Sequence, residues 1–297
     1  MCNATGSGRA PFLGKVWGRM RNDSTRAASA IFAANRARGS VTFDVHQVEG
    51  VTRRRQLHES GSLRVRFPSP EAEGLSAVFV NTAGGVAGGD RFTLGVTVEP
   101  EARLIVTTAA AEKVYRTLAP EARIDVKLDV AAGGSLAWLP QETILFDRAR
   151  LKRSIDVDLA EGARLVLAEA IVFGRSGMGE VVHDSFLFDR WRLRRGGRLM
   201  HAEALRLDGA VASRLAQPAV ANGGIAVATV LVVPGDEGTA AGVRALGDHF
   251  RGEVGVSAWN GLAAVRLCAA DGEALRHDLV AVLAAVRGAP LPRLWLN

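Results

Sequence analysis

The chain has 297 residues, 48% of them hydrophobic, which is enough to bury one substantial core. Its longest apolar run, residues 225–233, is well short of the roughly 18 residues that a membrane-spanning helix needs, so the sequence argues against a membrane protein. The two cysteines, Cys2 and Cys268, match neither a disulfide framework nor a metal-binding CxxC pair, and no long apolar signal-peptide core is present, so we expect a cytoplasmic protein.

The positive charge is concentrated at the start of the chain. The formal net charge is +6, and residues 1–40 hold seven basic residues and one acidic residue, so residues 41–297 are neutral overall. The Arg, Ser, Ala and Gly content of residues 1–40 predicts a basic, flexible N-terminal extension. An organellar transit peptide or a nucleic-acid-binding tail has a similar composition, and both remain alternatives.

A glycine-rich loop, NTAGGVAGGD, occupies residues 81–90. A nucleotide-binding loop would be followed by Lys and Ser/Thr or by a helix, whereas this loop ends in Asp90 and the strand-like segment RFTLGVTV. We therefore expect no bound nucleotide. The glycines permit positive φ angles and close backbone approach, so the loop is predicted to be a tight crossing between β layers. Its expected structural positions are Asn81, Gly84, Gly85, Gly88 and Gly89.

Residues 94–205 alternate apolar and polar side chains with period two, which predicts strands. Four successive segments each contain an alternating strand, a turn with Gly or Pro, a leucine, and a second strand that runs into a glutamate. The leucines are Leu104, Leu136, Leu165 and Leu199, and the glutamates are Glu112, Glu142, Glu169 and Glu203. This repeat predicts a mainly β fold of stacked, irregular layers, solenoid-like and built from two-layer sheets.

The pattern changes after Pro218, so we divide residues 41–297 into a β body at 41–217 and a small α/β cap at 218–297 with about two helices. Thr239 is expected to cap a short helix, and Asn260-Gly261 predicts a hairpin. Asp271 is expected to cap the clearest helix of the chain, which should end at Gly288.

Five segments occur in one order along the chain: NTAGGVAGGD, TTAAAEKVYRT at 107–117, LPQETILF at 139–146, EAIVFGRSGMGE at 169–180 and PRLW at 292–295. Together they resemble the UreD family of urease accessory proteins, also called UreH. The resemblance runs from about residue 41 to the C-terminus. It implies a non-enzymatic maturation factor that binds the urease structural subunits, contacts UreF directly, and acts with the GTPase UreG in inserting nickel into urease.

The residues themselves favour weak metal binding. The six histidines show no HxH or HxxxH spacing, so we expect no tightly bound cofactor and only transient nickel. Carboxylates give weaker, exchangeable sites, and a row of them can pass a hydrated cation along. The candidates for such a nickel path are Asp90, Glu142 and Glu169. Further candidates for the path or for an interface are Glu112, Tyr115, Arg175, Glu180 and Glu203.

Two other interpretations compete with this one. Stacked β layers with paired carboxylates also describe secreted polysaccharide-cleaving enzymes, although only Trp138 and Trp191 lie within the repeat to stack on sugars. Residues 53–55 and 194–195 are arginine runs, but they lack the interleaved aromatic residues typical of nucleic-acid binding. Taken singly, each candidate acid is better explained as a solvated or ion-paired strand residue.

Overall fold

The protein is represented by a computed structural model that describes residues 36–68, 74–118 and 120–296. The statements below concern these residues. Most of the predicted extension at 1–40 lies outside them, and the compact unit described here starts at Ala37. No helix in the described ranges is long and apolar enough to cross a membrane.

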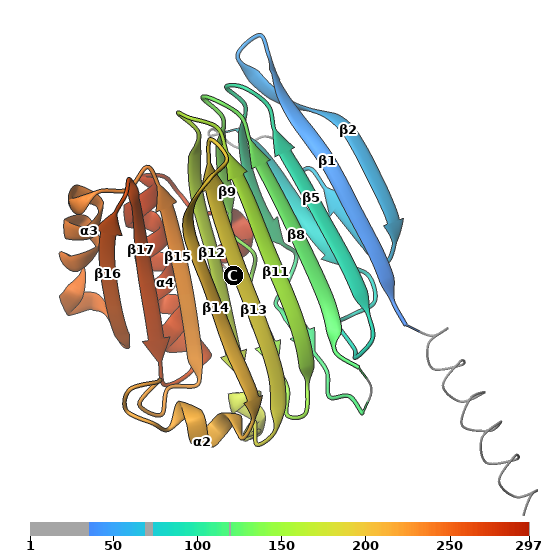
Figure 1. Cartoon of the computed structure of the whole chain (residues 1–297), viewed down its shortest axis with the longest axis vertical. Helices are drawn as coiled ribbons and strands as arrows, with labels where there is room; N and C mark the ends of the chain where they lie inside the picture. Colours follow the sequence, from blue (N-terminus) through green and yellow to red (C-terminus); the bar gives the residue numbers. More distant parts are fainter. Residues whose placement is uncertain (1–35, 69–73, 119, 297) are drawn as a thin grey trace, which may run out of the picture. The chain divides into compact units, whose positions relative to one another are not determined.

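Two sheets form the body of this unit (Figure 1). The first, sheet A, has seven strands in the spatial order β14 (Arg198–Gly209), β13 (Ser185–Arg195), β11 (Arg150–Leu159), β8 (Ala122–Val130), β5 (Arg91–Val98), β1 (Arg38–Val48) and β2 (Val51–Gly61). The five central strands, β13 to β1, run parallel, and the two edge strands pair antiparallel with their neighbours.

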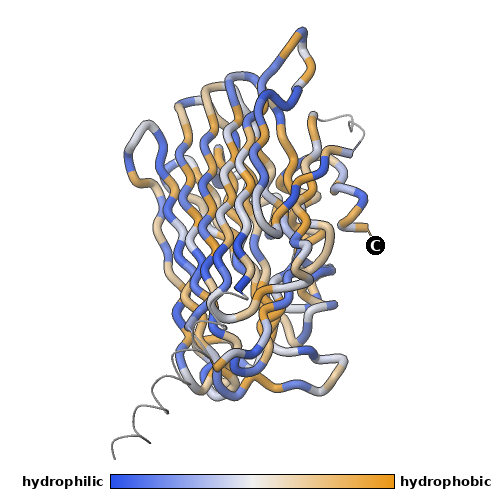
Figure 2. The backbone as a smooth tube through the Cα atoms, turned by 90° about the vertical axis from the view of Figure 1, so that its right-hand side faces the viewer, coloured by the Kyte–Doolittle hydropathy of each residue, from blue (hydrophilic) through white to orange (hydrophobic). Residues whose placement is uncertain are grey.

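The second sheet, sheet B, has ten strands. Its main path is β16 (Glu253–Trp259), β17 (Leu262–Ala269), β15 (Ala226–Val233), β12 (Arg164–Phe173), β9 (Ser135–Trp138), β6 (Arg103–Thr108), β4 (Leu75–Asn81) and β3 (Leu63–Arg66). Two short strands, β7 (Glu112–Val114) and β10 (Thr143–Leu145), continue the layer beside β12. Hydrophobic and hydrophilic residues alternate along the strands, as Figure 2 shows, and the larger core lies between the two sheets.

The stacked repeat is confirmed for its first three units. Each unit sends one strand into sheet A and, after a turn of four residues, a second strand into sheet B: β5 to β6, β8 to β9, and β11 to β12. Leu104 pairs with Leu136, and Leu136 pairs with Leu165, so the three leucines form one row across adjacent parallel strands. All three are buried. The fold is therefore mainly β and solenoid-like, as expected.

The fourth unit departs from the repeat. Only two residues, Gly196 and Gly197, separate β13 from β14, and both have positive φ angles of 54° and 79°. A two-residue turn of this kind produces an antiparallel hairpin, so β14 folds back within sheet A instead of crossing to sheet B. Leu199 is consequently 50% exposed, and its expected alignment with the other three leucines was wrong.

The C-terminal part continues sheet B. Strands β15 and β17 pair antiparallel beside β12, and β16 closes the edge through the predicted Asn260-Gly261 hairpin. The helix α4 (Gly272–Arg287) packs on the outer face of this sheet and begins and ends as predicted, because Asp271 accepts a hydrogen bond from the Ala274 amide and Gly288 is left-handed.

The shorter helices complete the unit. α3 (Glu237–Arg244) is capped by Asp236 and not by Thr239, because Thr239 is the third helical residue. Its amide donates to the Asp236 carboxylate and its hydroxyl accepts from the Asp236 amide, which forms a capping box. α2 (Val211–Leu215) follows β14, and three 3-10 turns lie at Ser176–Met178, Gly247–His249 and Arg293–Trp295.

The leucine row provides a stability test. Leu136→Ala should lower the free energy of unfolding by about 2–5 kcal/mol, because it opens a cavity between the sheets. Leu199→Ala should change it by no more than about 0.5 kcal/mol, because half of this side chain is already in water. Urea denaturation of both variants measures the difference, and equal losses would contradict the broken repeat.

Candidate functional site

A cavity of about 390 Å³ lies between the two sheets, at the end that carries the glycine-rich loop. Its walls come from both sheets and are largely apolar, with Phe79 and Trp138 on one side and Phe92 on the other. Four charged side chains also line it. Glu112 and Lys113 lie on β7, next to the loop, whereas Arg153 and Glu169 come from β11 and β12.

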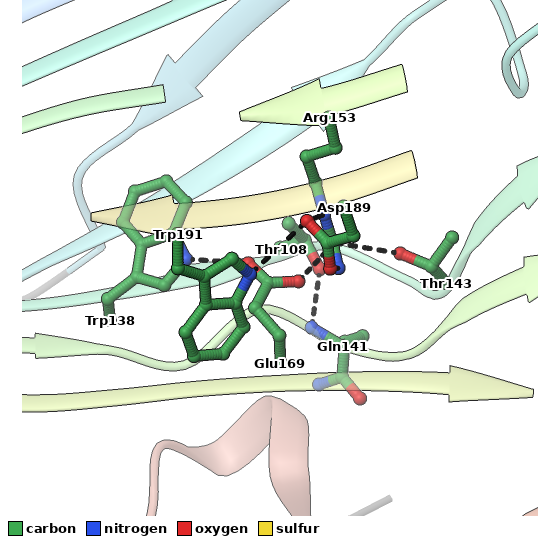
Figure 3. A network of polar contacts seen from close by, with 8 residues as sticks. All are labelled: Thr108, Trp138, Gln141, Thr143, Arg153, Glu169, Asp189 and Trp191. Atoms are coloured by element: carbon green, nitrogen blue, oxygen red, sulfur yellow. Dashed lines mark hydrogen bonds and ion pairs between the residues drawn. The ribbon is translucent and has the colours of Figure 1, made fainter. Parts of the chain in front are cut away.

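A buried ionic cluster forms the inner wall of this cavity (Figure 3). The guanidinium of Arg153 donates from Nε and Nη2 to the two carboxylate oxygens of Asp189, at 3.0 and 2.6 Å, and from Nη1 to Glu169. Arg153 and Asp189 are directly opposite each other on neighbouring strands of sheet A, whereas Glu169 belongs to sheet B. The cluster therefore joins the two sheets through their core.

Indole groups complete the cluster. Trp138 Nε1 donates to Glu169 at 2.9 Å, and Trp191 Nε1 donates to Asp189 at 3.2 Å. Each buried carboxylate oxygen thus has at least one donor, which is what a buried charge needs to be tolerated. These contacts also bury both tryptophans, so neither ring is displayed to stack on a sugar.

The cluster contains two carboxyl groups, Asp189 and Glu169, but only one cation, Arg153. Burial raises the pKa of Glu169, and the Arg153 charge only partly opposes this effect. Burial alone would lower the pKa of Arg153, but the two carboxylates outweigh it and hold the guanidinium pKa above its usual value. With both acids ionised, the inner wall carries one surplus negative charge.

Glu112 is the second acid of the cavity. Burial raises its pKa to about 7, against the hydrogen bond from Asn81, and nearby Asp90 adds to the rise. Asn81 Nδ2 lies 3.2 and 3.3 Å from the two carboxylate oxygens and also donates to the carbonyl of Gly85. A carboxyl group with this pKa exchanges its proton near neutral pH, so a divalent cation can replace that proton readily.

The glycine-rich loop forms part of the cavity wall through Asn81, Gly84 and Gly85. Gly85 has a φ of +146°, and a Cβ atom there would lie 2.3 Å from the Tyr115 ring. The Tyr115 hydroxyl donates to the carbonyl of Gly84 at 2.8 Å. Gly88 must be a glycine because there is no room for a side chain: a Cβ atom would lie 2.1 Å from Thr117 Oγ1. Gly84 and Gly89 also have positive φ angles.

The three acids singled out as a nickel path are not gathered in this cavity. Glu169 lines it, whereas Asp90 and Glu142 do not. The buried carboxylate of Asp90 accepts from the backbone amides of Ala37 and Ala87, at 2.8 and 2.7 Å, and so closes the loop and joins it to the start of β1.

Glu142 has a different environment. Its side chain accepts from Arg276 of α4 at 2.7 Å. Arg276 also donates to the carbonyl of Trp295, whose indole donates to the carbonyl of Leu139. Glu142 thus helps to hold α4 and the C-terminal turn against the segment between β9 and β10.

Three of the remaining candidates gather at a second hollow, of about 560 Å³, on the surface at this end of the stack. Arg175 stacks over the Phe146 ring and forms an ion pair with Glu180 at 2.7 Å, while Tyr115 packs edge-on against Phe146. We call this the end surface. It comprises the lining residues Tyr115, Arg116, Phe146, Asp147, Arg148, Arg175 and Glu180, with Leu118, which lies beside Arg116 and Arg148, and Met178, whose amide donates to the Arg175 carbonyl. Leu118 is fully exposed and Met178 is largely exposed.

Glu203 lies elsewhere. It accepts from Arg266 of β17 and contacts His201, so it links β14 to sheet B. Across the described residues, no three His, Cys, Asp or Glu side chains come together as a metal-binding group.

Sequence reasoning missed Arg153 and Asp189. A signal was present, because both occupy inward positions of alternating strands, Leu151-Arg153-Ile155 and Leu187-Asp189-Trp191. A charged residue in the apolar phase of a strand indicates a buried ion pair.

Comparisons with known proteins agree with the motifs. The family model described as UreD urease accessory protein matches residues 37–296. A urease accessory protein UreD of Rhodopseudomonas palustris (strain BisA53) is 62% identical over 275 residues, which cover 93% of this chain and 96% of that protein. A UreD of Bradyrhizobium diazoefficiens is 61% identical over 269 residues, 91% of this chain and 97% of that protein. The resemblance inferred from the five segments is confirmed.

The buried cluster can be tested by removing its cation. Arg153→Met leaves two buried carboxylates unpaired and should cost about 3–5 kcal/mol of unfolding free energy at pH 7. The cost should shrink at pH 5, because Glu169, whose pKa is raised by burial, can then take up a proton in the folded state. Arg251→Met, which removes a surface ion pair with Glu273, should cost less than about 1 kcal/mol. A small or pH-independent loss in Arg153→Met would contradict the ionic cluster.

Glu112 should make the protein less stable as pH rises. Its pKa is about 7 in the folded protein and near 4.5 when unfolded, so the unfolded chain loses this proton first and stability falls between these pH values. Glu112→Gln should therefore be more stable than wild type at pH 8, by on the order of 1 kcal/mol, and equal to it at pH 4. Melting temperatures across this range measure the effect.

Glu121 provides the matched control, because its pKa is shifted in the opposite direction to that of Glu112. Its own backbone amide and Arg123 hold the pKa of this partly exposed carboxyl below its usual value, so the ionised form stabilises the fold. That stability is present above pH 4.5 and is lost as pH falls. Glu121→Gln should show no gain at pH 8, and a gain equal to that of Glu112→Gln would refute the assignment.

Proposed function

This chain belongs to the UreD family of urease accessory proteins, and from that premise we propose that it is a non-enzymatic maturation factor that assists nickel insertion into urease in the cytoplasm. The observation that carries the proposal is the cavity between the sheets, which holds two acids of raised pKa, Glu112 and Glu169. We propose that nickel passes through this cavity as cargo and is not retained.

The side chains that line the cavity suit the passage of nickel better than its tight binding. Nickel(II) binds tightly to imidazole and thiolate, and the cavity lining contains neither. Carboxylates and water bind it weakly, and weak binding at successive positions allows a cation to leave as well as to enter. Glu112 stands beside the glycine-rich loop, and Glu169 adds negative charge deeper inside. Together they would draw a hydrated cation inward.

The end surface supports the proposal that UreF binds directly. It combines exposed apolar side chains, Leu118 and Met178, with aromatic and arginine side chains, a composition typical of protein interfaces. Tyr115 belongs to this surface and also contacts Gly84 and Gly85 of the cavity wall. A partner bound there would lie next to the cavity, where cargo can pass between proteins. UreG would act within the same complex.

The glycine-rich loop supports the proposal that GTP is used by UreG and not by this chain. The backbone amides of Ala87, within the loop, and of Ala37, just before β1, already donate to Asp90, so a phosphate would have to displace a carboxylate that the chain itself supplies. The acids of the cavity likewise support cation binding more than glycoside cleavage. The tryptophans beside them are buried hydrogen-bond donors and are not displayed to stack on a sugar.

The metal path is tested at Glu112. Glu112→Gln removes the charge and keeps the size, so the accessory complex should form normally while the nickel content of co-expressed urease falls to about half or less. Urease activity should fall in proportion. Glu112→Asp keeps a carboxylate and should retain most of the loading. Nickel is measured by mass spectrometry on purified urease.

Glu161→Gln serves as the control, because Glu161 is an exposed turn residue outside the cavity lining. It should leave complex formation, nickel content and activity unchanged. Full nickel loading with Glu112→Gln would refute the path, and failure of the wild-type chain to associate with UreF or urease would refute the maturation role itself.

A further inference from the structure

A row of cations crosses the outer face of sheet A. The strand register places Arg38 opposite Arg91, Arg91 opposite Arg123, and Arg123 opposite Lys152. The row continues through Phe188 to Arg206. We call these six residues the basic row: Arg38, Arg91, Arg123, Lys152, Phe188 and Arg206. With strands about 4.8 Å apart, the row is roughly 24 Å long.

The row is exposed and only partly neutralised. All five cations have solvent-exposed side chains. Arg123 has an ion pair with Glu121 and Arg206 has one with Asp208, each at 3.0 Å. Lys152 lies over the Phe188 ring. Among the described residues, Arg38, Arg91 and Lys152 make no ion pair, so about three positive charges remain uncompensated along one line.

Such a row works against stability. Like charges directly opposite each other on neighbouring strands repel, and here the repulsion recurs from strand to strand. The other rows of the same face avoid it. Lys127 pairs with Asp129, and three arginines of β13 surround Asp156 at 2.6–4.0 Å. Among the described rows, only the first, where the central strands begin, has cations on four adjacent strands.

The position of the row connects it to the site. Arg91 follows Asp90, the last residue of the glycine-rich loop, and Lys152 follows the segment that contributes Arg148 to the end surface. The row therefore borders the end of the stack that carries the cavity. In Figure 1 the strands β1, β5, β8, β11 and β13 lie side by side, and the two longer helices pack on sheet B instead.

We propose that the basic row docks a strip of carboxylates on the surface of the urease apoprotein. The proposal rests on the proposed function and adds the surface and the chemistry by which the client is held. A line of exposed cations complements a line of acidic side chains, and charged contacts of this kind speed association while leaving the complex reversible. Reversibility suits a client that must be released after activation, whereas the apolar end surface suits a more lasting partner.

The chemistry of the face favours a protein over a nucleic acid. Single strands are bound by displayed aromatic rings, but Phe186 and Phe188 are half-buried beneath the cations of Arg150 and Lys152. A duplex is wider than one row and would place phosphates over Asp125 and the neighbouring acids. A single line of carboxylates meets only the row.

The test uses the full chain co-purified with its cognate UreF, with the urease apoprotein as the binding partner. The triple variant Arg91→Gln/Arg123→Gln/Lys152→Gln should raise the dissociation constant roughly tenfold at low salt, because three charge pairs are lost. Raising the salt concentration should weaken wild-type binding strongly and variant binding little. The melting temperature of the variant should not fall below that of wild type, because the repulsion removed along the row outweighs the loss of the exposed Arg123–Glu121 ion pair.

The matched control is Arg53→Gln/Arg164→Gln/Arg198→Gln, which removes the same charge from exposed positions outside the row. It should bind within about twofold of wild type. Unchanged binding by the row variant, equal loss in the control, or a lower melting temperature of the row variant would overturn the proposal. Loss of UreF, or tight binding of duplex DNA that depends on the row, would overturn the choice of occupant. If wild type itself does not bind the apoprotein, the proposed function fails as well.

Discussion

The two sheets are held in one alignment by the ionic cluster of Arg153, Asp189 and Glu169. Apolar side chains between sheets can slide past one another at modest cost, whereas a buried guanidinium must find both carboxylates in place or lose several kcal/mol. Because Asp189 lies on the neighbouring strand and Glu169 on the facing sheet, this requirement fixes β11, β12 and β13 together. Trp138 donates to the Glu169 oxygen that Arg153 does not contact. Trp191 adds a second donor to Asp189 Oδ1, so every carboxylate oxygen of the cluster has a donor.

The same cluster determines the character of the cavity beside it. Arg153 and Glu169 give this otherwise largely apolar cavity a charged inner wall, whereas the leucine row deeper in the stack is packed with apolar side chains. Glu112, at the other end of that space, is buried enough for its pKa to rise towards neutrality. The cluster that aligns the two sheets thus also places acidic groups in the cavity, which is what the proposed nickel path requires.

The outer faces of the two sheets differ in what covers them. The outer face of sheet B is covered by α4, so its strands are apolar on both sides near the C-terminal part. The outer face of sheet A is exposed to solvent and carries charged side chains. Many of these form ion pairs, whereas the basic row keeps positive charges that no ion pair neutralises. The cavity, the end surface and the basic row all meet at the end of the stack where the central strands of sheet A begin. The proposed maturation role, in which several proteins would meet around one cargo, requires such a concentration of surfaces.

The sequence by itself determined the layered β architecture, the C-terminal helix from Asp271 to Gly288, and the family, because these depend on local periodicity, capping and ordered motifs. It also contains the two-residue turn at Gly196-Gly197, shorter than the four-residue turns before it, which breaks the repeat. Tertiary structure alone decided which acids share a space. Asp90, Glu142 and Glu169 occupy similar places in the sequence pattern, yet one closes a loop, one holds α4 and one lines the cavity. Period-two alternation says which way a side chain points from its own strand, but its partner comes from a distant strand or helix, and only packing brings them together.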